Sequence, residues 1–210
     1  KPKRPLMAIV AGSKVSTKLD LLQNLVQKVD YLVVGGGMAN TFLSALDYPI
    51  GQSLSEKDML DTAHAILAQA KVSGCEVILP RDVAVTLEIK AYVSREIVTI
   101  TQVQPSHKIV DIGQETIDYI ATKLKSCATV IWDGPVGIFE VPPFDVGSTA
   151  LAKLIAVKTK NAGLISVAGG GDTLAALAHA QCLDDFSYTS TAGGAFLEWL
   201  EGKSLPGVMA

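Results

Sequence analysis

The 210-residue chain has few cysteine, aromatic and charged residues. Its three cysteines, Cys75, Cys127 and Cys182, lie far apart and form no CxxC pair, which argues against a disulfide framework; we interpret them as buried thiols in a reducing compartment. The formal net charge is only −3, so the composition argues against a nucleic-acid partner. No apolar run is long enough to span a bilayer, and the first residues lack the pattern of a signal peptide. We therefore expect a cytoplasmic protein with no membrane partner.

Histidine is also scarce, with three residues in the chain. His64 and His179 fall in expected helices, and His107 falls in an expected loop. None of them has a cysteine or a second histidine at ligand spacing, so a histidine metal site is not expected. No Ser-His-Asp or Cys-His set can be assembled from the sequence either.

The chain is rich in short apolar runs, and hydrophobic residues make up 49% of it, as suits strands that are buried on both faces. The pattern predicts strands over residues 6–10, 31–34, 76–79, 129–132, 164–167 and 187–189. It predicts helices over residues 16–29 and 55–71, capped by Ser16 and Ser55, and over 38–45, 114–125, 147–158, 173–180 and 195–200. Residues 83–87 and 97–103 predict a small antiparallel β flap. This alternation indicates a single α/β domain over residues 1–210, with a doubly wound, Rossmann-like parallel sheet and helices on both faces.

Three of the expected strands end in clusters of small residues, at positions 35–37, 169–171 and 190–194. Glycine lets the backbone approach a ligand closely, and the helix that follows offers unpaired N–H groups to an anion. Asp172 adds a carboxylate suited to Mg²⁺. One such cluster alone is usually a tight turn. Three of them predict a ligand crevice, because the carboxyl ends of parallel strands share one edge of the sheet.

Two lysines, Lys14 and Lys18, follow the first expected strand and Gly12. They are one helical turn apart, so both can reach the mouth of the crevice and meet a phosphate chain. The alternative is a pair of surface lysines, but their place after a strand-ending glycine favours the phosphate site. The GxxxxGK[ST] spacing is absent, which excludes a P-loop.

A fourth motif runs from Trp132 to Glu140 and contains a Gly-Pro turn. The Glu140 carboxylate can accept hydrogen bonds from ribose hydroxyls, although the motif could also be a turn with a surface acid. A dinucleotide-dependent oxidoreductase is the alternative function, but the glycine spacing of its fingerprint is absent from this sequence. Asn40 and Leu174 occupy the positions where the third glycine or alanine of that fingerprint belongs.

Together these motifs resemble those of phosphoglycerate kinase, in the family's order and over essentially the whole chain. The motifs are AGSKVSTK, VGGGMA, WDGPVGIFE, GGGDT and STAGGA, at residues 11–18, 34–39, 132–140, 169–173 and 190–195, with a matching tail at 200–207. The resemblance is to the C-terminal, nucleotide-binding half. It implies that the N-terminal domain, which carries the 3-phosphoglycerate site in the family, is a missing partner. It also implies a monomer that binds Mg²⁺ with ADP or ATP and is inactive alone. A noncatalytic nucleotide-binding module remains the alternative.

The resemblance also implies roles for individual residues. Lys14 would contact the nucleotide phosphates, and Lys18 would follow the phosphoryl group in flight. Glu140 would hold the ribose, Asp172 would ligate Mg²⁺, and Thr173 would bind phosphate. The adenine slot would be bounded by Gly35, Gly36, Val110, Pro135 and Ile138. Gly193 and Gly194 would present N–H groups to the charge on the transferred phosphoryl. The remaining expected nucleotide-binding residues are Gly12, Asp133, Gly170 and Gly171.

Three residues depart from the family's usual pattern: Ser13 stands for alanine, Ala192 for glycine and Asp133 for asparagine. Asp133 matters most, because a carboxylate repels a polyphosphate unless Mg²⁺ or a lysine offsets it. If it is ionised beside the phosphates, removing its charge tightens nucleotide binding, and we favour this alternative. If it supports Mg²⁺, or pairs with Lys14 or Lys18, removing its charge weakens binding.

Overall fold

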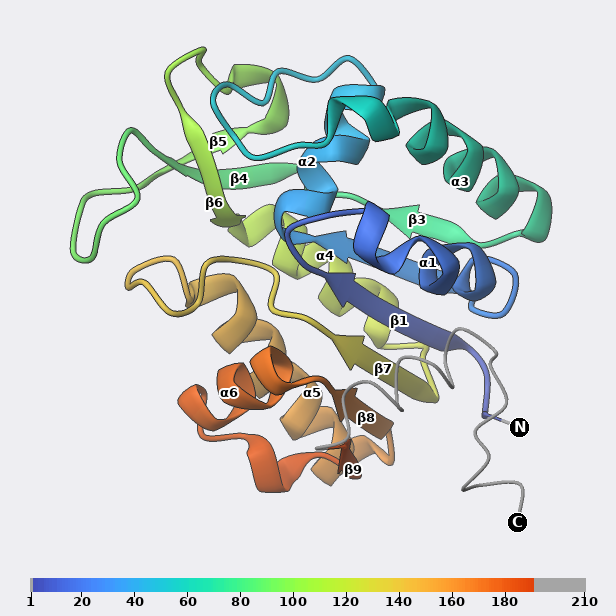
Figure 1. Ribbon diagram of the computed structural model, residues 1–210. Helices are drawn as coiled ribbons and strands as arrows, with labels where there is room; N and C mark the ends of the chain where they lie inside the picture. Colours follow the sequence, from blue (N-terminus) through green and yellow to red (C-terminus); the bar gives the residue numbers. More distant parts are fainter. Residues whose placement is uncertain (1, 191–210) are drawn as a thin grey trace.

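The computed structural model describes residues 2–190 and contains a central parallel sheet with helices on both faces (Figure 1). The six strands lie in the order β3-β2-β1-β7-β8-β9, and every neighbouring pair is parallel. Their bounds are β1 Leu6–Ala11, β2 Tyr31–Gly35, β3 Glu76–Ile78, β7 Thr129–Asp133, β8 Ile165–Gly169 and β9 Tyr188–Ser190. The strand order runs outward from β1 in both directions, which confirms the predicted doubly wound α/β fold.

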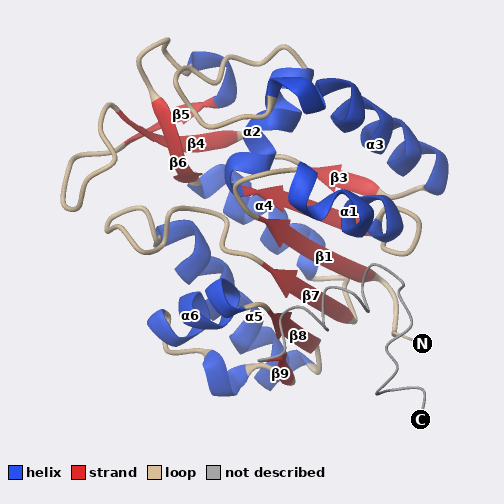
Figure 2. Ribbon diagram, viewed as in Figure 1, coloured by secondary structure: helices blue, strands red, loops and turns tan. Residues whose placement is uncertain are grey.

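Within residues 2–190, three helices cover each face of the sheet (Figure 2). Helices α1 Leu19–Leu25, α2 Gly36–Ala45 and α3 Leu60–Ser73 pack on one face, and α4 Gln114–Leu124, α5 Val146–Ala162 and α6 Gly171–His179 pack on the other. The alternation of β1 explains this arrangement: Ala8 and Val10 belong to the first core, whereas Met7 and Ile9 belong to the second. Both sets are buried, so the strand is apolar throughout.

A second sheet of three antiparallel strands, in the order β5-β4-β6, lies beside the main one. Its strands are β4 Asp82–Thr86, β5 Glu96–Thr99 and β6 Lys108–Ile112. The predicted flap is therefore confirmed, with two differences. Residues 100–102 form a short 3₁₀ helix instead of extending the strand. Strand β6 was not predicted, because its charged residues interrupt the apolar pattern. One of them, Asp111, is buried and accepts backbone hydrogen bonds from Ile112, the next residue of β6, and from Gly147 of α5.

The two predicted serine caps are wrong. Ser16 begins a 3₁₀ turn that ends at Lys18, and its hydroxyl donates to Glu56 instead of capping α1. Residues 57–59 form another 3₁₀ turn before α3, so Ser55 does not cap that helix. The predicted helix over 195–200 lies outside the described residues. Within residues 2–190, no helix is both long and apolar enough to cross a membrane.

Candidate functional site

A pocket with a volume of about 570 Å³ lies at the carboxyl ends of the central strands. Strand β1 pairs with β2 on one side and with β7 on the other. The strand order runs outward from β1 in both directions, so the pocket lies where the direction of the strand order reverses. The pocket brings together twelve of the predicted site residues: Gly12, Lys18, Gly36, Val110, Asp133, Pro135, Ile138, Glu140, Gly170, Gly171, Asp172 and Thr173.

Among the described residues, two predicted site residues, Lys14 and Gly35, are not part of this lining. The side chain of Lys14 is exposed and lies outside the pocket wall. Gly35 is buried, and a Cβ atom there would lie 2.8 Å from Cγ1 of Val136, so this glycine allows β2 to pack closely against the segment after β7. Gly193 and Gly194 lie outside the described residues.

Two glycine-led helix starts face the pocket. Gly36 opens α2 with φ +66°, and a Cβ atom there would lie 2.7 Å from the Gly12 carbonyl oxygen. Gly170 precedes α6 with φ +92°, a conformation that favours glycine. Apart from the chain neighbours of Gly171 and the backbone of α6, no atom of residues 2–190 lies within 4 Å of a Cβ built on Gly171, so these residues leave the space beside the first turn of α6 open. The N-terminus of α6 can therefore meet an anion.

Lys18 and Asp133 form an ion pair at the floor of the pocket. Nζ of Lys18 lies 2.7 Å from Oδ2 of Asp133, and the two side chains are 16% and 5% exposed. The pair joins the loop after β1 to the end of β7. Asp133 therefore makes one of the contacts that the second alternative named, a pair with Lys18, and the effect of its charge on nucleotide binding stays a prediction. Burial raises the pKa of Asp133 most strongly, Lys18 lowers it, and nearby Asp172 raises it, with a net increase.

Thr173 is buried at the start of α6 and fixes the turn after β7. Its Oγ1 accepts a hydrogen bond of 2.7 Å from the backbone N–H of Gly134. A hydroxyl that accepts this bond still has its own proton to donate. Thr173 therefore holds the Gly-Pro turn in place and keeps one donor for a ligand.

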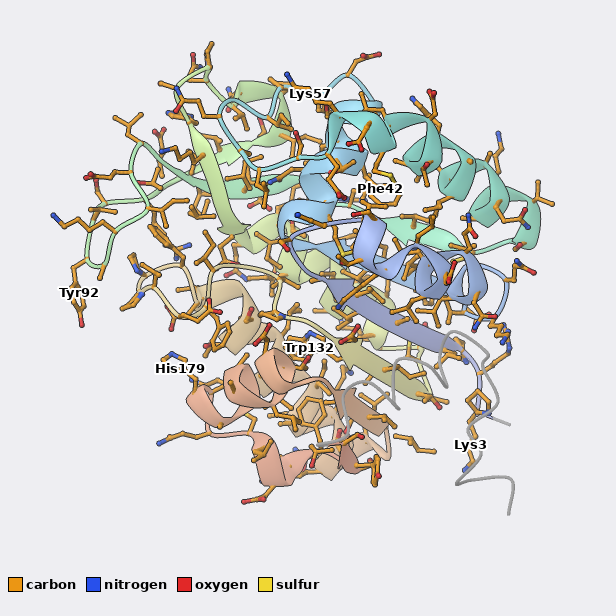
Figure 3. The ribbon with its side chains drawn as sticks, viewed as in Figure 1. Lys3, Phe42, Lys57, Tyr92, Trp132 and His179 are labelled. Carbon is orange, nitrogen blue, oxygen red and sulfur yellow. The ribbon has the colours of Figure 1, made fainter. Side chains whose placement is uncertain are left out.

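The other end of the pocket is apolar and was largely missed by the sequence analysis. It is formed by the small sheet, the loops beside it and the segment after β7, with the apolar lining residues Leu54, Val83, Ile89, Ile109 and Val136. The polar residues Gln52, Ser53 and Lys108 also line it. The loop that carries Ile89 is tied to the segment after β7, because the backbone N–H of Tyr92 donates to the Pro142 carbonyl at 2.8 Å. Figure 3 shows the Tyr92 side chain projecting from this loop, whereas Trp132 lies inside the fold. Leu54 and Ile89 are exposed apolar residues, a property that only the structure shows.

Asp111 is a second buried carboxylate in the pocket wall that the sequence analysis missed. Its oxygens accept hydrogen bonds from the backbone N–H groups of Gly147, at 2.7 Å, and Ile112, at 2.9 Å. Burial is the main cause that raises its pKa, from 3.8 to about 7. Asp111 thus links the small sheet to α5.

The geometry can be compared with proteins of known family. The family model described as phosphoglycerate kinase matches residues 1–203. The chain belongs to the phosphoglycerate kinase family. Relatives named phosphoglycerate kinase from Rhodospirillum centenum and Methylorubrum populi are 54% and 56% identical, over 210 and 209 residues. The resemblance inferred from the motifs is thereby confirmed.

Solved phosphoglycerate kinases have the same fold. The structure of phosphoglycerate kinase from Coxiella burnetii matches with a TM-score of 0.94 at 45% sequence identity. The match covers 100% of the present chain and 53% of the Coxiella chain. The structure from Pyrococcus horikoshii has a TM-score of 0.80 at 24% identity, which supports the fold alone. The two sequence relatives are likewise covered over only 53% and 52% of their length. The chain therefore spans about half the length of the phosphoglycerate kinases it matches.

The pocket fits the Mg²⁺ that the family implies. Within residues 2–190 there is no cluster of three or more His, Cys, Asp or Glu side chains that would form an all-protein metal site. Mg²⁺ usually keeps several waters and uses one or two carboxylates together with substrate phosphates. Asp172 is exposed on the pocket wall and can supply such a carboxylate.

Proposed function

We propose that this chain binds an adenine nucleotide with Mg²⁺ and provides the nucleotide-binding half of a phosphoglycerate kinase. That enzyme transfers a phosphoryl group between 1,3-bisphosphoglycerate and ADP. The observation that carries the proposal is the division of one pocket into two ends. An apolar end suits a base, and an end with Lys18 and the start of α6 suits phosphates.

The apolar end accounts for recognition of the base and ribose. Val110, Pro135 and Ile138 bound a slot for adenine, and Gly36 lines the same pocket. The backbone N–H of Ile138 donates to the Val110 carbonyl at 2.9 Å, so two of these walls hold each other in place. Glu140 is exposed at the rim, where its carboxylate accepts hydrogen bonds from ribose hydroxyls.

The polar end accounts for the phosphates. Gly170 and Gly171 bring the backbone N–H groups of α6 to the phosphate chain, and Thr173 adds its hydroxyl proton. Asp172 holds Mg²⁺, which offsets phosphate charge when bound. Lys18 provides positive charge on the path of the transferred group, with Lys14 at the entrance. Gly193 and Gly194 would add N–H donors around the phosphoryl.

We further propose that the chain alone does not turn over substrate. Phosphoryl transfer depends on positioning of the substrates and on exclusion of water. The binding site for the carboxylate substrate would lie in the half of the relatives that this chain does not cover. The half-length match also supports a second candidate, a noncatalytic nucleotide-binding module. Turnover assays on this chain joined to the other half separate the two candidates, because only the kinase half gains activity.

Thermal unfolding with and without nucleotide tests the binding proposal. A ligand at a hundred times its dissociation constant stabilises the native state by about 2.7 kcal/mol, which shifts a melting curve measurably. Millimolar MgADP and MgATP should raise Tm, and NAD should not. Asp172→Asn should reduce the shift with MgADP more than the shift with ADP in EDTA. A Tm raised by NAD and unchanged by MgADP would refute the proposal.

A further inference from the structure

The ammonium group of Lys18 is fully engaged inside the protein. Its Nζ lies 2.7 Å from Oδ2 of Asp133, 2.8 Å from the Ala11 carbonyl oxygen and 3.4 Å from the Asp133 carbonyl oxygen. A lysine ammonium has three N–H donors, which is the number of oxygens around it here. A phosphate that binds Lys18 must therefore displace one of these oxygens.

Two glycines of the pocket wall lie close to the pair. A Cβ atom on Gly134 would lie 3.3 Å from Nζ of Lys18, and one on Gly170 would lie 3.0 Å from Oδ1 of Asp133. The pair therefore lies directly beneath the backbone segments that face the phosphates. Both side chains also line the pocket, so a ligand can reach them.

We propose that Asp133 is an internal competitor for Lys18, which lowers the affinity of the pocket for nucleotide phosphates. This inference rests on the proposed function, and it deepens it by naming a residue that sets the affinity. Asp133 offsets the charge of Lys18 at 2.7 Å, so the incoming phosphate gains the attraction of Lys18 only by weakening the pair.

From the sequence alone, pairing of Asp133 with a lysine suggested that removing the Asp133 charge would weaken nucleotide binding. The geometry of the pair favours the opposite result. Pairing would help binding if Asp133 were needed to hold Lys18 in place. The Ala11 carbonyl, at 2.8 Å, already holds the same ammonium from the backbone of β1. Asparagine at position 133 would have the same size and keep an oxygen acceptor, but it would carry no charge. The ammonium would stay in place and become available to an anion.

Calorimetric titration of Asp133→Asn tests the proposal. We expect this substitution to tighten MgADP binding by about three- to tenfold at low salt, with a smaller gain at high salt because the charges are screened. In a Lys18→Met background the same substitution should have much less effect, because the competition is then absent. Asp30→Asn is the matched control, since it removes an equal charge at the opposite end of β1, where Asp30 pairs with Arg4. It should leave the Kd unchanged.

The outcomes separate this inference from alternatives. Weaker binding by Asp133→Asn would overturn it and make Asp133 a positioning residue for Lys18. Equal tightening in both backgrounds would also overturn it and indicate direct repulsion between Asp133 and phosphate. Each titration is repeated with magnesium tripolyphosphate, which carries no adenine. If that ligand shows the Lys18-dependent gain while MgADP does not bind, the proposed function fails and the competition stands. Circular dichroism and Tm confirm that each variant is folded.

Discussion

The buried carboxylate of Asp111 accepts a hydrogen bond of 2.7 Å from the backbone N–H of Gly147, near the start of α5. Glycine is required at this contact, because a Cβ atom on Gly147 would lie 2.4 Å from Oδ1 of Asp111. This hydrogen bond attaches β6 to α5, a helix that packs on the central sheet. It thereby fixes the apolar end of the pocket, which β6 helps to form. A carboxylate in this position makes the attachment sensitive to pH.

The buried Asp111 side chain predicts that the free energy of unfolding depends on pH. Burial raises the folded-state pKa of Asp111 from 3.8 to about 7, with Asp145 raising it further and Arg95 and the backbone N–H groups lowering it. The folded protein therefore holds this proton more tightly than the unfolded chain does. The stability that results is present below about pH 4 and is lost as the pH rises toward 7. Urea unfolding of the wild type and Asp111→Asn between pH 4.5 and 8 measures it. The wild type should lose stability relative to the variant as the pH rises, and a constant difference would contradict the prediction.

Gly170 and Gly171 should differ sharply although they are neighbours. Gly170 has φ +92°, so Gly170→Ala should lower the free energy of unfolding by about 1–3 kcal/mol through backbone strain. Gly171 has open space around it and lies in α6, so Gly171→Ala should leave stability unchanged or slightly raised. Its methyl group should instead obstruct the phosphates and weaken MgADP binding by about tenfold, or about 1.4 kcal/mol. Urea unfolding and calorimetry on both variants check this. Unchanged MgADP binding by Gly171→Ala would contradict the assignment of Gly171 to the ligand, and equal effects on stability would contradict the backbone argument for Gly170.

Gly35 is predicted to serve packing and not the adenine slot. A Cβ atom there would lie 2.8 Å from Cγ1 of Val136, so Gly35→Ala should cost about 1–3 kcal/mol of stability. Val136→Ala removes the atom that clashes, and the double variant should recover part of that loss relative to Val136→Ala alone. A thermodynamic cycle from urea unfolding measures the coupling between the two positions. Additive losses would show that Val136 is not the obstacle.

Lys18 and Lys14 should affect the full-length enzyme differently. Lys18→Ala should lower kcat about 10²–10³-fold while changing the KM for nucleotide much less, because its charge acts best on the phosphoryl group in transit. Lys14→Ala should act more on KM, in keeping with its exposed place outside the pocket wall. Steady-state kinetics at saturating Mg²⁺ measure both effects. A change confined to KM in Lys18→Ala would show that the two roles are assigned wrongly.

By itself the sequence was sufficient to determine the fold class, the family and most of one wall of the pocket. Apolar strands that end in glycine, repeated along the chain, specify a parallel sheet whose carboxyl ends meet at one edge. This is why Gly12 and Gly170 could be placed at one edge of the sheet from their positions, whereas Asp133 was assigned to the site through the resemblance to the family. Local patterns carry this information because each strand end is followed directly by the residues that face the crevice.

Only the tertiary structure decided which groups touch each other there. The Lys18–Asp133 pair joins residues 115 positions apart, and its consequence depends on a third group, the Ala11 carbonyl. Strand β6 depends on its pairing with β4, and the apolar wall near Ile89 depends on residues far apart in the sequence that the fold brings together. The buried Asp111 in β6 is tolerated because Gly147, on a distant helix, supplies an N–H and leaves room for it. Such contacts are set by three-dimensional packing and by the hydrogen bonds that buried polar groups require, and neither is encoded in the spacing of residues along the chain.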